Sequence, residues 1–82
     1  MQKILIADDE AKIRRIIRDF LTAKGFETVE AEDGAQALRV FSENSDIALA
    51  VLDIMMPEMN GWEVCRKIRE TSDVPVIFLT AR

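Results

Sequence analysis

Four oxygen-bearing side chains stand directly after short apolar runs of the sequence. They are Asp8, Asp9, Asp53 and Thr80. Short apolar runs are typical of strands that are covered on both faces. The four side chains are therefore predicted to stand at strand ends, where a parallel sheet brings together residues that are distant in sequence.

Three carboxylates gathered at one place require a cation. Two unit charges ~5 Å apart repel by about 3 kcal/mol at an effective dielectric constant of ~20. The sequence has no histidine and a single cysteine, so the available ligands are oxygens and the expected ion is Mg²⁺ or Mn²⁺ rather than zinc. A magnesium ion held by one or two carboxylates keeps positions open for phosphate oxygens. The residue types thus favour phosphoryl chemistry, with the Thr80 hydroxyl placed to donate a hydrogen bond to a group attached to Asp53.

Taken singly, each of these residues has an ordinary structural explanation. Asp8 or Asp9 could cap a helix, Asp53 could begin a turn, and a threonine at the end of a strand could reflect β-propensity alone. The functional interpretation therefore depends on the elements that bring these side chains together.

The hydrophobic periodicity predicts those elements. Apolar residues spaced by three and four between positions 13 and 21 indicate an amphipathic helix that ends at Gly25. Asp33 and the Asn60-Gly61 pair mark the starts of two further helices. We predict strands at residues 3–7, 26–31, 47–52 and 74–79, and helices at residues 10–24, 33–43 and 61–70.

This alternation of strands and helices predicts an α/β fold with a parallel sheet. A doubly wound sheet in the order 2-1-3-4 fits best, because the polar second strand suits an edge and the most apolar third strand suits the interior. The second and third helices would share one face, and the first helix would lie alone on the other. Asp8, Asp9 and Asp53 then meet at the point where the strand order reverses, which is the usual ligand site of such sheets.

Length and charge limit the functions open to the chain. Its 82 residues allow one domain. A net charge of −4 argues against a nucleic-acid or anionic membrane surface, and no apolar run is long enough to span a membrane. A lone cysteine cannot form an internal disulfide, so a cytoplasmic setting is expected.

Three segments of the sequence resemble the signature segments of the response-regulator receiver domain of two-component signalling. They are residues 4–10, 51–61 and 75–81, and the run D-x-M-M-P-x-M-x-G within the second is the most specific. The resemblance implies a flavodoxin-like fold. It also implies a phosphoacceptor module, not an enzyme, that works with a sensor histidine kinase and takes part in transcription regulation.

The resemblance implies a role for each matching position. Asp53 corresponds to the phosphoacceptor, Asp9 to a direct metal ligand, and Asp8 to a neighbour that acts mostly through a metal-bound water. The backbone carbonyl of Met55 would complete the metal site. The Thr80 hydroxyl and the backbone N–H of Ala81 would contact the phosphoryl group.

The chain departs from the family pattern where it stops. The family continues with a fourth helix, a fifth strand that ends in a Lys-Pro pair, and a fifth helix, so residues 1–82 are expected to form about two thirds of a receiver domain. The lysine that would bridge the phosphoryl group and the acceptor is missing. We also expect self-association, because strand 74–79 would be left at the sheet edge and the face beside the 10–24 helix partly bare.

Two other functions remain open from the sequence. The chain could be a folded metal-binding interaction fragment that is never phosphorylated. It could also be a Mg²⁺-dependent aspartyl phosphatase of the haloacid-dehalogenase type, but those enzymes resemble D-x-D-x-T/V, whereas Asp53 is followed by Ile-Met-Met.

Overall fold

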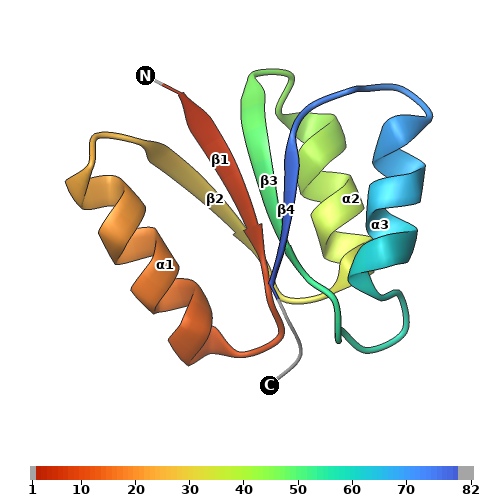
Figure 1. The fold of residues 1–82 in the computed structure, drawn as a ribbon, viewed down its shortest axis with the longest axis horizontal. Helices are drawn as coiled ribbons and strands as arrows, with labels where there is room; N and C mark the ends of the chain where they lie inside the picture. The colour runs from red at the N-terminus through yellow and green to blue at the C-terminus, as the bar shows by residue number, and fades with distance from the viewer. Residues whose placement is uncertain (1, 80–82) are drawn as a thin grey trace.

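The computed structural model describes residues 2–79, which form seven alternating strands and helices (Figure 1). The elements are β1 (Lys3–Ala7), α1 (Ala11–Ala23), β2 (Glu27–Ala31), α2 (Gly34–Glu43), β3 (Ile47–Asp53), α3 (Gly61–Arg69) and β4 (Val76–Leu79). The predicted elements are all present, with ends that move by one or two residues. The largest difference is at β4, which begins at Val76, after Pro75.

The four strands form one parallel sheet in the order β2-β1-β3-β4. Figure 1 shows α1 on one face of this sheet and α2 with α3 on the other. The predicted doubly wound topology, with the polar second strand at an edge, is confirmed. In the paired registers Ala7 lies opposite Ala31 on one side and Leu52 on the other, so the carboxyl ends of β1 and β3 are level.

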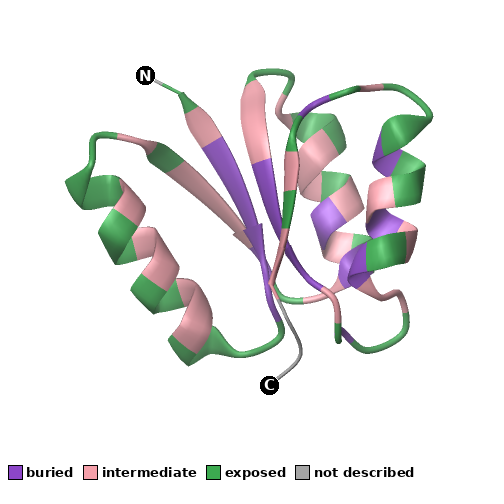
Figure 2. Cartoon of the chain, in the orientation of Figure 1, coloured by how far each residue is buried: buried purple, intermediate pink, exposed green. Residues whose placement is uncertain are grey.

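The two faces of the sheet are packed unequally (Figure 2). The face under α2 and α3 carries the larger core, in which Leu5, Leu52 and Val64 are fully buried. The face under α1 carries a smaller cluster built from Ile4, Ile6 and Val51. Ile17 and Leu21 of α1 pack against this cluster, but no residue of α1 is fully buried. Helix α1 is therefore the least embedded of the three helices.

The helix ends follow the local sequence. Helix α1 ends at Ala23, and Gly25 follows with a φ of +93°, which glycine adopts without strain. The Gly25 and Phe26 N–H groups donate to the carbonyls of Thr22 and Leu21. Asn60 caps α3 in a reciprocal capping box with Glu63. These caps fix where the loops leave the sheet.

Helix α2 starts at the predicted place, but its start differs in one detail from a standard capping box. The Asp33 side chain accepts from the Gln36 N–H, as expected for an N-cap. The Gln36 side chain, however, accepts from the N–H of Glu32, one residue before the cap. The Gln36 side chain thus bonds one residue further back than the Glu63 side chain does in the capping box of α3.

Several large apolar side chains remain exposed on the α1 side of the molecule. Ile16 and Phe20, one turn apart on α1, are 59% and 62% exposed, and Ile77 of the edge strand β4 is 51% exposed. The predicted helical periodicity is correct, but of the five apolar side chains that it includes, only Ile17 and Leu21 pack against the buried cluster of the sheet. Within residues 2–79, none of the helices combines the length and apolar character that crossing a membrane would require.

Candidate functional site

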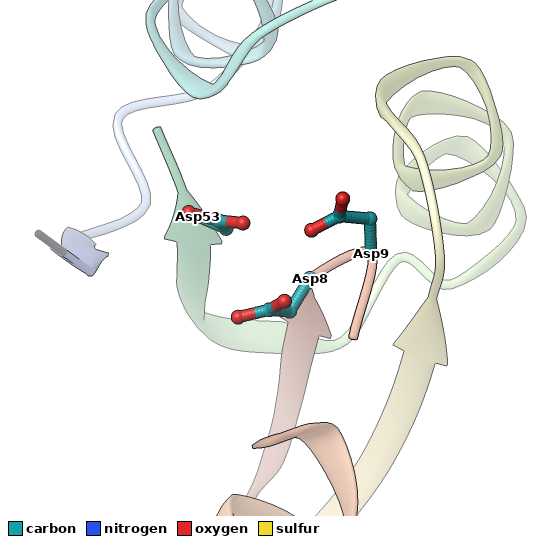
Figure 3. Close-up of side chains that lie close together, drawn as sticks. All are labelled: Asp8, Asp9 and Asp53. Atoms are coloured by element: carbon teal, nitrogen blue, oxygen red, sulfur yellow. The ribbon is translucent and has the colours of Figure 1, made fainter. Parts of the chain in front are cut away.

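The carboxylates of Asp8, Asp9 and Asp53 gather at the carboxyl ends of β1 and β3. Each offers an oxygen atom, and these oxygens all lie within 4.8 Å of one another. Figure 3 shows the three side chains directed toward a common point from two adjacent strands. The convergence predicted from the strand order is therefore present. Asp53 is the last residue of β3 rather than the first residue after it.

The buried carboxylates of Asp8 and Asp53 each accept a hydrogen bond from a nearby main-chain N–H, in the same local pattern. Asp8 Oδ1 accepts from the Glu10 N–H at 2.8 Å, and Asp53 Oδ1 accepts from the Met55 N–H at 3.1 Å. In both cases the donor lies two residues after the aspartate, the pattern that aspartate favours where the chain turns. Asp8 and Asp53 are completely buried, whereas Asp9 is exposed. The site thus has two fixed carboxylates and one that reaches solvent.

This arrangement has an electrostatic cost that a cation would relieve. At a separation of 4.8 Å, each pair of ionised carboxylates repels by about 3 kcal/mol at an effective dielectric constant of ~20. All the ligand atoms are carboxylate oxygens, which are the ligands that small hard divalent cations prefer. The residues present therefore fit a Mg²⁺ or Mn²⁺ ion.

The loop between β3 and α3 packs tightly against the acidic strand end. A Cβ at Gly61 would lie 2.5 Å from the main-chain oxygen of Asp53, so a side chain there would push the start of α3 away from the site. Within the loop, Glu58 has a φ of +66°, which a residue with a side chain seldom adopts. The loop is thus shaped by one glycine that permits close approach and by one strained residue.

A hollow of about 590 Å³ opens beside the acidic cluster. It is lined by Asp9, Ile54, Met55, Met56, Pro57, Asn60 and Trp62. The Met55 and Trp62 side chains are more than half exposed, and the Trp62 ring packs at 41° to that of Phe78 with a 4.2 Å centroid separation. The sequence analysis did not identify Trp62 as a site residue. Its position directly after the Asn60-Gly61 turn was the available signal that it borders the site.

The remaining expected site residues differ in how far the structure describes them. Met55 follows Asp53 closely, and its N–H is bonded to the Asp53 carboxylate; its carbonyl is the group for which a metal role was expected. Thr80 and Ala81 lie outside the described residues.

One further residue was missed by the sequence analysis. Arg14, on α1, donates a hydrogen bond to the Asp8 carbonyl from six residues away, and no short motif indicates this contact.

Comparison with protein families gives one match, to the response regulator receiver domain, over residues 4–82. The chain belongs to the response regulator receiver family. Receiver domains are regulatory modules of two-component systems. Two similar curated proteins bear names of transcriptional regulators. The probable transcriptional regulator ycf27 of Pyropia yezoensis is 50% identical over 98% of this chain and 32% of its own length. The uncharacterized transcriptional regulatory protein YrkP of Bacillus subtilis is 42% identical over 98% of this chain and 34% of its own. The chain thus spans about a third of the length of these relatives.

Solved receiver structures share the fold over nearly the whole chain. The response regulator TrrA of Thermotoga maritima, in complex with Mg²⁺ and BeF, has a TM-score of 0.93 and 40% identity, covering 100% of this chain and 71% of that one. A complex of TrrA with the histidine kinase ThkA gives a TM-score of 0.90 at 40% identity, covering 99% and 70%. A receiver domain protein from Clostridium thermocellum gives 0.92 at 34%, covering 98% and 65%. The flavodoxin-like receiver fold is therefore confirmed.

Proposed function

We propose that this receiver domain accepts a phosphoryl group on Asp53 from the phosphohistidine of a sensor histidine kinase. The observation that carries the proposal is the cluster of Asp8, Asp9 and Asp53 at the strand-order reversal of a receiver fold. Receiver relatives solved with Mg²⁺ and BeF, and with a histidine kinase, support the same assignment. We further propose that residues 1–82 form a single partial receiver domain, in line with the 65–71% coverage of those solved chains.

The proposed transfer exchanges one bond to phosphorus for another. A carboxylate oxygen of Asp53 attacks phosphorus, the P–N bond to the histidine breaks, and the imidazole nitrogen takes up a proton as it leaves. The product is an acyl phosphate on Asp53. Asp8, Asp9, Asp53 and the Met55 carbonyl would hold the Mg²⁺ or Mn²⁺ ion, which when bound would neutralise charge on the phosphoryl oxygens.

Thr80 and Ala81 complete the proposed contacts to the phosphoryl group, through a hydroxyl and a backbone N–H. The 82 residues contain no Lys-Pro pair of the kind that provides the bridging lysine in the family. We therefore expect slow labelling of this chain. We also propose a cytoplasmic location and a role in transcription regulation. The net charge of −4 gives no reason to assign nucleic-acid binding to this chain itself.

Acetyl phosphate treatment followed by intact-protein mass spectrometry tests the proposal. We expect a gain of one phosphoryl group that requires Mg²⁺ and is lost on hydroxylamine treatment, which cleaves acyl phosphates. Asp53→Asn is the matched variant, because it keeps the size and the hydrogen-bond acceptor of the side chain. Labelling that survives unchanged in Asp53→Asn would contradict the assignment. Mg²⁺ binding without any labelling would favour the metal-binding interaction fragment instead.

Exposed apolar residues support a second proposal, that this 82-residue chain associates with another copy of itself. Ile16, Phe20 and Ile77 lie exposed on the α1 side of the sheet, and among residues 2–79 β4 is an edge strand. These features agree with the self-association surface expected at residues 74–79 and beside residues 10–24. The oligomeric state in solution tests this proposal.

A further inference from the structure

Arg14, in the first turn of α1, connects that helix to the acidic site and to the edge strand β2. Its Nη1 donates a hydrogen bond of 2.6 Å to the main-chain carbonyl of Asp8. Its Nε donates one of 3.2 Å to Oε1 of Glu30, and the two side chains form an ion pair. The Arg14 side chain is only 14% exposed. The guanidinium thus contacts the Glu30 carboxylate on β2 and the Asp8 carbonyl just after β1.

The bond to the Asp8 carbonyl controls the peptide group that joins Asp8 to Asp9. A peptide group is planar, so fixing its oxygen also fixes the orientation of the Asp9 N–H. Asp8 is constrained in other ways as well, because its N–H donates to the Ala31 carbonyl at 3.1 Å and its carboxylate accepts from Glu10. Asp9 is the exposed member of the cluster, and burial does not fix its direction. Arg14 acts at the peptide that sets this direction.

Arg14 also places a permanent positive charge against the segment that carries two of the three carboxylates. Its own partner, Glu30, is also bonded by Arg18, at 3.4 Å. Glu30 therefore pairs with two arginines of α1, and the Arg14 guanidinium is held by Glu30 as well as by the Asp8 carbonyl.

We propose that Arg14, supported by Glu30, is a positioning residue for the acidic site. It holds the Asp8–Asp9 peptide in the orientation that directs both carboxylates toward Asp53, and in this way it sets the affinity of the site for a divalent cation. The inference rests on the proposed function, since it requires the three carboxylates to bind such an ion. The competing explanation is structural: because α1 has no fully buried residue, Arg14 could serve only to anchor the helix.

Mn²⁺ titration of the 82-residue chain, followed by electron paramagnetic resonance of the free ion, separates the two explanations. Arg14→Met keeps the aliphatic stem and removes the donors. We expect it to weaken Mn²⁺ binding about 10-fold or more, as is typical when a residue that orients a metal ligand is removed. The titration is run below the melting transition of each variant, so that a purely structural role leaves the affinity unchanged.

Arg15→Met is the matched control. Arg15 follows Arg14 on α1 and is exposed, so its replacement removes the same unit of positive charge from the same helix. We expect the affinity of this variant for Mn²⁺ to stay within about twofold of the parent, since no metal ligand is reoriented.

A second pair of variants covers the case in which Arg14→Met does not fold. Arg14→Lys keeps the charge but cannot donate in two fixed directions, and Glu30→Gln removes the ionic support. Both are expected to weaken Mn²⁺ binding, by less than Arg14→Met. Affinities equal to that of the parent in both would overturn the positioning role while the metal site stands. A parent chain that binds no Mn²⁺ would instead overturn the metal site itself, and the inference with it.

Discussion

Two of the three clustered carboxylates are completely buried, which is rare for aspartate unless a partner compensates for lost hydration. Main-chain N–H groups supply part of that compensation at Asp8 and Asp53. Mutual repulsion within 4.8 Å remains. The residues that equip the protein to bind a cation are therefore the ones that destabilise it when no cation is bound, a trade-off common at functional sites.

Replacement of Asp53 by asparagine should stabilise the protein in EDTA. The change removes one repelling charge and keeps an oxygen that can accept from the Met55 N–H. We expect a gain of about 1–2 kcal/mol, or several degrees in the melting temperature. Circular dichroism melts measure it. Asp73→Asn, at an exposed position just before β4, is the control for a general change in charge. Equal shifts in the two variants would contradict the repulsion argument.

Magnesium should raise the melting temperature of the parent chain and have little effect on Asp9→Asn. An ion that binds only the folded state stabilises it by RT ln(1 + [L]/Kd), which is about 1.4 kcal/mol at ten times Kd. Excess EDTA should reverse the shift. An equal response in Asp9→Asn would show that the ion binds elsewhere, because Asp9 is the exposed member of the cluster.

The positions of these carboxylates could be predicted because strand ends are visible in the sequence as the ends of apolar runs. Asp8 and Asp53 needed only the strand order to be brought together. The support from Arg14 could not be predicted, since it depends on the path of a long side chain from α1 to the carbonyl of Asp8, just after β1. The position of Trp62 at the site could not be predicted either. A helical pattern indicates the helix face on which Trp62 lies, but not that a hollow opens between it and the neighbouring loop.

At the level of elements, the loop between β3 and α3 decides the shape of the site. Its backbone was expected to turn at Asn60-Gly61, and the capping box confirms this start of α3. The positive φ at Glu58 was not expected, because an isolated glutamate gives no sign of a left-handed conformation. Met56, two residues before Glu58, is buried, so this loop is anchored by tertiary packing that a local pattern does not predict.

Glu58→Gly should stabilise the protein. Glycine adopts a φ of +66° without the steric penalty that glutamate bears, and part of the gain is offset by the greater freedom of glycine in the unfolded chain. The expected net gain is up to ~1 kcal/mol in chemical denaturation. Glu58→Ala removes the same charge and keeps the Cβ, so it should give none of this gain. A similar gain in both variants would assign the effect to charge.

At the scale of the whole molecule, the two faces of the sheet differ in how well they are covered. Helices α2 and α3 bury a continuous core, whereas α1 covers its face alone and leaves Ile16, Phe20 and Ile77 exposed. Covering ~400 Å² of apolar surface would contribute on the order of 10 kcal/mol before the costs of association. An uncovered apolar face of that size would favour self-association, in line with the proposal made above.

Phe20→Lys should shift the chain toward the monomer. Phe20 is 62% exposed on the open face, and a second positive charge beside Lys24 opposes burial of that face in a partner. Multi-angle light scattering at tens of micromolar measures the mass. Ser42→Lys adds the same charge to an exposed position of α2 and should leave the parent's state unchanged. A parent chain that is already a stable monomer would contradict the proposal.

The strand order β2-β1-β3-β4 also has a kinetic consequence. The central strand β1 is the first to be synthesised, yet it is not paired on both sides until β3, with Leu52 opposite Ala7, has joined the sheet. Pairings so distant in sequence form slowly, and the acidic cluster exists only after this one has formed. A bound cation should therefore mainly lower the unfolding rate, and it should change the folding rate little.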